Sequence, residues 1–173
     1  MPDLEALRSR YVALTGSEPE GLWFGPGRVN LIGEHTDYSG GLVFPMAIQL
    51  GTTVEGDLLD GEIRLRSDDQ REPLHLTLPV VDPAAVTPAW GRYVAGVASE
   101  LAVETGLDGR VASNLPAGAG LSSSAALEVG FARGHEMPPV GAPSFKRMGA
   151  FDKGRLARTH GLGVPMSAAP LAR

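Results

Sequence analysis

Polar side chains that could hold a small polar ligand are concentrated in residues 27–41, Gly-Arg-Val-Asn-Leu-Ile-Gly-Glu-His-Thr-Asp-Tyr-Ser-Gly-Gly. The carboxylates of Glu34 and Asp37 accept hydrogen bonds, and the imidazole of His35 donates or accepts one. Adjacent sugar hydroxyls both donate and accept, so this cluster suits a neutral sugar. Arg28 offers planar donors that match phosphate oxygens. The alternatives are a solvated turn or a helix cap, and no metal-ligand spacing is present.

A second segment, residues 115–128, has the composition of a phosphate-binding loop that leads into a helix. Its glycines let backbone N–H groups converge on an anion, and a helix N-terminus adds its dipole. Its serine hydroxyls can cap the helix, contact phosphate or bind Mg²⁺. No Gly-Lys-Ser/Thr follows, so it is not a Walker A loop. A glycine-rich turn with a serine N-cap is the alternative. The candidate anion-binding residues are Pro116, Gly118, Gly120, Leu121, Ser122, Ser123 and Ser124.

Short strands and amphipathic helices are expected to position these two segments. Helical spacing of apolar residues predicts helices at 4–14 and 90–101, ended by Gly16 and Gly106. Asp60-Gly61 between two alternating runs predicts a hairpin, and Gly25-Pro26-Gly27 predicts a break in the first extended segment. Hairpins covered by helices indicate an α+β domain. The predicted extended segments cover residues 22–32, 52–59, 62–67, 74–78 and 110–114.

Bulk composition narrows the protein class and the compartment. The net charge of −5 gives no indication of a nucleic-acid or anionic-membrane partner. The absence of cysteine excludes disulfides and thiolate ligands, as is common in a reducing cytosol. Residues 1–5 have no signal-peptide features, and no apolar run approaches the ~18–20 residues of a membrane span. We therefore expect a cytoplasmic protein.

The composition changes abruptly after Val129. Residues 130–173 contain seven Gly, five Pro, seven Lys or Arg and two Asp or Glu, a net charge of +5. Residues 1–129 have eight basic and eighteen acidic residues, a net charge of −10. One fold rarely changes composition so sharply, so we predict a domain at 1–129 and an unmatched, disordered tail at 130–173. Translation of GC-rich DNA in a shifted frame would produce such a tail, and a lineage-specific ending is the alternative.

Together the two segments resemble the galactokinase family of the GHMP kinase superfamily. The first, continued by Leu42-Val43-Phe44-Pro45-Met46-Ala47-Ile48, is similar to the galactokinase signature almost residue for residue. The second is similar to the superfamily's Pro-x-x-x-Gly-Leu-Ser-Ser-Ser-Ala loop, and residues 90–97 resemble the intervening helix. The resemblance covers residues 4–129. It implies an α+β N-terminal domain of the ribosomal-protein-S5 domain 2-like type. The family's ferredoxin-like C-terminal domain has no counterpart in the sequence.

The resemblance implies ATP-dependent phosphorylation of α-D-galactose at its anomeric hydroxyl, with Mg²⁺. It implies that Glu34, His35 and Asp37 bind the sugar, and that Arg28 stabilises charge on the transferred phosphoryl group. It further implies that the loop residues named above wrap the ATP phosphates, with Ser123 as a Mg²⁺ ligand. It also implies a monomeric full-length protein whose partners are galactose and ATP, without nucleic acid or membrane.

The family's catalytic Asp lies in a third segment ending Gly-x-Met-Asp-Gln, and no such segment follows here. We therefore expect this chain by itself to be inactive or nearly so, because proton removal from the sugar needs a carboxylate. Two alternatives stay open. One is a kinase for a related sugar such as N-acetylgalactosamine, and the other is a non-catalytic sensor that binds galactose and ATP.

Overall fold

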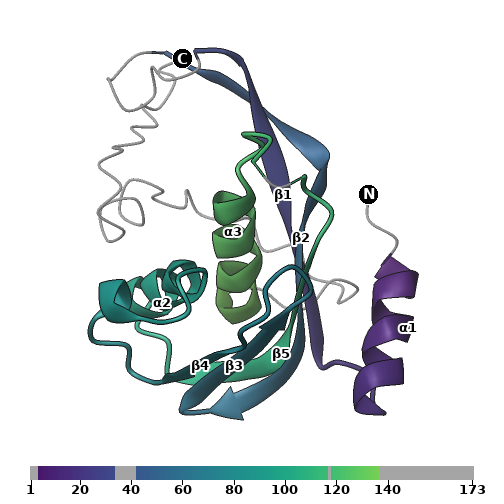
Figure 1. Cartoon of the computed structure of the whole chain (residues 1–173), viewed down its shortest axis with the longest axis vertical. Coiled ribbons are helices and arrows are strands. Elements are labelled where there is room, and N and C mark those ends of the chain that lie inside the picture. The colour runs from purple at the N-terminus through teal and green to yellow at the C-terminus, as the bar shows by residue number, and fades with distance from the viewer. Residues whose placement is uncertain (1–3, 34–41, 117, 137–173) are drawn as a thin grey trace.

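The computed structural model of the chain describes residues 4–33, 42–116 and 118–136, and these form one five-stranded sheet with helices on both faces (Figure 1). The expected α+β class is confirmed. None of the helices in these ranges is long and apolar enough to cross a membrane. The elements are α1 (Leu4–Thr15), β1 (Gly21–Ile32), β2 (Phe44–Asp60), β3 (Glu62–Ser67), β4 (Leu74–Thr77), the 3-10 helix η2 (Pro83–Ala85), α2 (Gly91–Glu100), β5 (Thr105–Ser113) and α3 (Ser123–Glu136).

The strand order is β1-β2-β5-β3-β4, so the predicted hairpin between the second and third strands is wrong. The chain does turn at Gly61, where φ is +70°. However, β5 lies between β2 and β3. It pairs antiparallel with β2 and parallel with β3. Parallel pairing requires a crossover, which β4 and α2 provide. The insertion depends on Gly106, because a Cβ there would overlap the carbonyl oxygen of Glu62.

Both predicted helices are confirmed, but one predicted end is wrong. α1 is followed by Gly16, whose φ is +83° and whose N–H donates to the carbonyl of Val12 at 2.8 Å. α2 ends at Glu100 with Leu101 as its C-cap, well before Gly106, which lies inside β5. Glycine and aspartate at the start of β5 are poor strand formers, so the pattern indicated only the second half of that strand.

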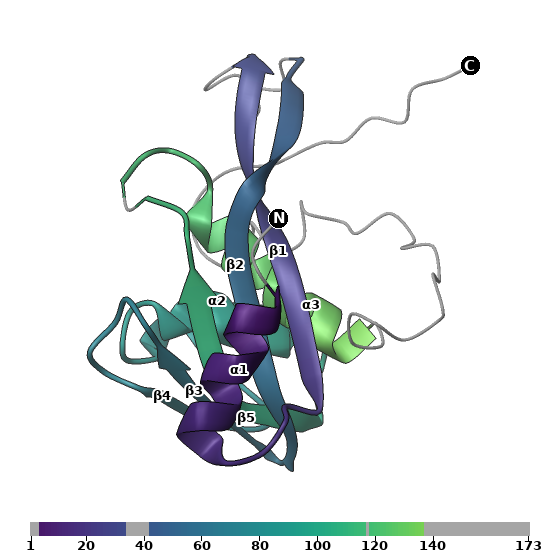
Figure 2. The ribbon, with the colours of Figure 1, turned by 90° about the vertical axis from the view of Figure 1, so that its right-hand side faces the viewer.

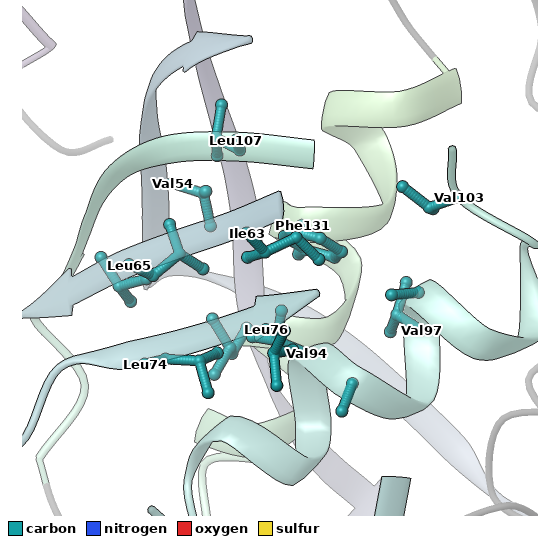
Figure 3. Close-up of a cluster of buried hydrophobic side chains, with 14 of the residues drawn as sticks. Val54, Ile63, Leu65, Leu74, Leu76, Val94, Val97, Val103, Leu107 and Phe131 are labelled. Atoms are coloured by element: carbon teal, nitrogen blue, oxygen red, sulfur yellow. The ribbon is translucent and has the colours of Figure 1, made fainter. Parts of the chain in front are cut away.

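The hydrophobic core lies between the sheet and the helices α2 and α3 (Figure 3). Phe131 is 1% exposed and packs with the buried side chains of α2. α3 therefore continues through position 130, where the composition changes, and Ala132 is also buried. The labelled core side chains are Val54, Ile63, Leu65, Leu74, Leu76, Val94, Val97, Val103, Leu107 and Phe131.

α1 covers the opposite face of the sheet through polar contacts (Figure 2). The Tyr11 hydroxyl donates to Asp57 Oδ2 on β2 at 3.1 Å, and its pKa is raised, first by burial and then by that carboxylate. Arg10 Nη1 lies 3.0 Å from Asp68 Oδ2, and the same carboxylate also pairs with Arg110 of β5. These contacts fix the helix to β2 and to the end of β3, and the pair with Arg110 extends the link to β5.

Glu55 of β2 lies beneath this polar layer and is 1% exposed. Burial raises the pKa of its carboxyl to about 7, although Arg110 and Arg10 act in the opposite direction. Its Oε2 has no hydrogen-bond partner among the described residues, and neither does the buried Nε of Arg110. The hydrogen bonds available to Glu55 therefore offset little of the cost of burying its charged carboxylate.

Candidate active site

Arg28 is positioned by β1, which pairs with β2 along its whole length. The predicted break at Gly25-Pro26-Gly27 is a shift of register between Pro26 and Arg28 within one continuous strand. Gly27 lies at this shift, and a Cβ there would stand 2.5 Å from Leu115 Cδ2 and 3.1 Å from the carbonyl oxygen of Leu121. The absent side chain thus lets the loop after β5 lie directly against the strand.

The loop after β5 is tied to the sheet at its start and then exposes its backbone. Asn114 Oδ1 accepts from the N–H of Gly51 at 2.7 Å, which anchors the loop to β2. Gly118 and Gly120 have φ values of +73° and +69°, and a Cβ added at either position would meet nothing within 4 Å. These positions favour glycine because of their backbone conformation rather than for lack of room.

The loop and the strand meet through two hydrogen bonds from the same residue. The backbone N–H of Arg28 donates to the carbonyl of Leu121 at 3.1 Å. Its side-chain Nε donates to Ser122 Oγ, also at 3.1 Å. The guanidinium group is therefore held at the point where the loop enters α3.

Two glycines bring α3 close to β1 and β2. A Cβ on Gly25 would overlap the carbonyl oxygen of Ala126, so the first turns of the helix lie against the strand. A Cβ added on Gly130 would stand 3.3 Å from Val54 Cγ2 on β2. The carbonyl of Ser122 accepts the first helical bond, from Ala126 at 2.9 Å. The helix N-terminus and the arginine consequently share one corner of the domain.

This corner has the electrostatics of an anion site. The positive end of the α3 dipole, the exposed backbone around Gly118 and Gly120, and the Arg28 guanidinium all favour negative charge. Such an arrangement can hold phosphate groups and stabilise charge that develops on them.

The structure brings together Arg28, Leu121 and Ser122 of the predicted site residues. Pro116, Gly118 and Gly120 lie in the same exposed loop, while Ser123 and Ser124 form the first turn of α3. The predicted sugar ligands Glu34, His35 and Asp37 lie outside the described residues. β1 ends at Ile32, and Gly33, with φ of +93°, directly precedes the first of them.

Ser123 alone does not make a metal site. No group of three or more His, Cys, Asp or Glu side chains that could hold a metal occurs within residues 4–33, 42–116 and 118–136. A single serine hydroxyl suits Mg²⁺ only when phosphate oxygens and water supply the other ligands, as they do for a nucleotide-bound ion. Ser123 is therefore compatible with Mg²⁺ that arrives with ATP.

Sequence reasoning gave no role to Glu128, which lies in the second turn of α3. Burial raises the pKa of its carboxyl to about 7. The available signal was a single acidic residue within the apolar run Ala125–Val129. The contact between Arg28 and Ser122 was also missed, because these residues are 94 positions apart in the sequence.

Comparison with known proteins finds similarity for both segments that form this corner, the strand that carries Arg28 and the loop that leads into α3. Residues 9–57 match the galactokinase galactose-binding signature, and residues 92–136 match the N-terminal domain of GHMP kinases. A galactokinase from Streptomyces coelicolor is 45% identical over 126 residues, which cover 69% of this chain and 32% of that protein. This region of the chain is similar to the galactokinase family. A galactokinase from Bos taurus is 44% identical over 137 residues, 73% of this chain and 34% of the relative.

Solved structures agree with this assignment. The structure of Lactococcus lactis galactokinase complexed with galactose superposes with a TM-score of 0.60 and 34% identity, over 72% of this chain and 34% of that one. Methanococcus jannaschii mevalonate kinase, at 24% identity and a TM-score of 0.55, shares the fold. The chain thus spans about a third of the length of the galactokinases it matches. The expected GHMP-kinase N-terminal fold is confirmed.

Proposed function

We propose that this chain supplies the galactose-binding and phosphate-binding parts of a galactokinase. Such an enzyme transfers the γ-phosphoryl group of ATP to the anomeric hydroxyl of α-D-galactose and yields α-D-galactose 1-phosphate. One observation carries the proposal. The hydrogen bond from Arg28 to Ser122 joins a residue of the galactose-binding signature to a residue of the GHMP kinase region. Arg28, a residue of the galactose-binding signature, therefore lies where the proposed phosphate loop meets α3.

The proposed roles follow from the chemistry of the corner. Phosphoryl transfer depends mainly on positioning and on stabilising charge on the phosphoryl oxygens. Arg28 supplies a fixed cation beside the N-terminus of α3. Pro116 has no N–H and begins the loop. The backbone N–H groups of Gly118, Gly120, Leu121 and Ser122 and the hydroxyls of Ser123 and Ser124 supply hydrogen-bond donors for the ATP phosphates. Mg²⁺ would be held between these phosphates and Ser123 and would neutralise part of their charge.

Sugar recognition is assigned to Glu34, His35 and Asp37, which follow Gly33 at the end of β1. Their donor and acceptor groups match neighbouring sugar hydroxyls. β1 carries Arg28 six residues before Glu34, so one strand leads from the proposed phosphoryl site to the proposed sugar site. This continuity would align the two reacting groups.

Binding and turnover should be measured separately. NMR titrations of the ¹⁵N-labelled chain with galactose are expected to show saturable binding that Asp37→Ala weakens, with glucose as the control sugar. MgATP should perturb the amides of Gly118, Gly120 and Ser123. A folded chain that binds neither ligand would overturn the proposal. In a protein that also contains the family's aspartate segment, ADP release that depends on galactose should disappear in Arg28→Ala. An unchanged rate there would remove this residue from the mechanism.

The same measurements distinguish the two alternatives. A preference for N-acetylgalactosamine over galactose would indicate a kinase for that sugar. Binding of galactose and MgATP without ADP release, in a protein that also contains the family's aspartate segment, would indicate a sensor.

A further inference from the structure

Ser122 has a backbone conformation that its neighbours in the loop achieve with glycine. φ is positive at Gly118, Gly120 and Ser122, with values of +73°, +69° and +61°. Only one other non-glycine residue of the described ranges has a positive φ, namely Ala102. An L-residue in this region is strained, because its Cβ crowds the backbone, and glycine would avoid that strain. A serine in this strained conformation therefore indicates that its side chain makes a contact that glycine could not make.

The Ser122 hydroxyl is directed at Arg28. Its oxygen accepts from the guanidinium Nε at 3.1 Å, in a partly buried setting. A hydrogen bond from a charged donor is stronger than a neutral one and fixes the plane of the guanidinium group. The backbone bond from Arg28 N–H to the Leu121 carbonyl ties the same two segments together one residue earlier. Loop and arginine are thus joined at both backbone and side chain.

We propose that Ser122 is a positioning residue that holds the Arg28 guanidinium against the phosphate loop, so that the loop and the arginine act as one unit. This inference rests on the proposed function for the role of Arg28. It differs from a direct phosphate contact by Ser122, because the hydroxyl acts through the arginine.

The test uses two substitutions of Ser122 that both tolerate a positive φ and differ in whether the side chain offers an oxygen acceptor. They therefore distinguish the effect of the backbone conformation from the effect of the hydroxyl. Ser122→Gly removes the acceptor and relieves the strain, so the domain is expected to fold with equal or greater stability. Ser122→Asn also tolerates a positive φ and restores an oxygen acceptor. Ala102→Gly is the matched control, because it relieves the other strained φ at a site that follows α2.

The first measurement needs neither sugar nor nucleotide. The side-chain Nε–H signal of Arg28, assigned with Arg28→Lys in ¹⁵N-labelled chain, is expected to exchange with water at least tenfold faster in Ser122→Gly. The rate should recover in Ser122→Asn and stay unchanged in Ala102→Gly. An unchanged Nε–H signal in Ser122→Gly would overturn the inference, whatever the protein phosphorylates.

The second measurement addresses the linked role in the reaction. Where galactose-dependent ADP release is measurable, Ser122→Gly should lower kcat roughly tenfold with little change in KM for ATP, and Ser122→Asn should restore it. A raised KM for ATP with unchanged kcat would instead assign Ser122 to direct phosphate binding and overturn the positioning role. If the unsubstituted chain bound neither galactose nor MgATP, the proposed function would be refuted. The exchange rate of the Arg28 Nε–H would still decide whether Ser122 holds the guanidinium group.

Discussion

Replacement of Glu55 by glutamine should stabilise the domain in a pH-dependent way. The pKa of this carboxyl is about 7 in the fold against 4.5 for the unperturbed group. Because the folded pKa is the higher one, the stability contributed by the neutral carboxyl is fully present below about pH 4.5. It is lost as the pH rises through 7. At about 1.4 kcal/mol per factor of ten in proton affinity, the loss amounts to about 3 kcal/mol at pH 8.

Urea unfolding followed by circular dichroism at pH 5 and pH 8 tests this value. A glutamine amide does not titrate, so Glu55→Gln should be more stable by about 3 kcal/mol at pH 8 and by less than about 1 kcal/mol at pH 5. With a typical slope of ~1–3 kcal/mol per molar urea, the midpoint at pH 8 should rise by about 1–3 M. Glu104→Gln is the matched control, because Glu104 is exposed and its replacement should leave both midpoints nearly unchanged.

Two results would refute the reasoning. If Glu55→Gln were less stable than the parent protein at pH 8, the carboxylate would be charged and held by Arg110 in a favourable ion pair. If the difference in stability were equal at both pH values, Glu55 would not titrate in this range. The first outcome would mean that Arg110 compensates the charge of Glu55 although it also pairs with Asp68.

Two further predictions concern α3. Gly25→Ala would place a methyl group on the carbonyl oxygen of Ala126 and should cost about 1–3 kcal/mol or more. Gly130→Ala, which has more room and favours the helix, should cost clearly less in the same urea titration, and equal losses would contradict the close packing of helix and strand. Phe131→Ala should cost about 3–5 kcal/mol because the ring is 1% exposed. An unchanged midpoint would place residues beyond 129 outside the folded domain.

The sequence predicted local features of the fold well and the pairing of distant strands poorly. Apolar spacing located α2 and the alternating strand β4 because one face of each is buried. It also located α1, although Tyr11 is the only buried side chain among the described residues of that helix and Leu14 is 62% exposed. The turn at Asp60-Gly61 was also correct, but the partner of β3 was not. Local patterns show where the chain reverses direction, whereas the insertion of β5 depends on contacts across the whole sheet.

The candidate site could be predicted as two separate segments, and the contact between them could not. Residue types around Arg28 and in the loop at 115–124 suggested sugar and phosphate chemistry independently. The bond from Arg28 to Ser122 spans 94 positions and depends on the bulge in β1 and on the missing side chain of Gly27. The boundary predicted at 129 and the roles of individual site residues stay predictions, and α3 crosses that boundary.

The late position of β5 in the chain has a consequence for protein synthesis. Until residues 105–113 leave the ribosome, β2 and β3 each lack the neighbour that separates them in the finished sheet. Until β5 emerges, the nascent chain therefore carries two open strand edges, one on β2 and one on β3, and such edges are templates for wrong pairing. β5 is the central strand and the last of the five described strands in chain order, so the sheet closes in a single step once β5 is made, and chaperones have the most to protect just before that step.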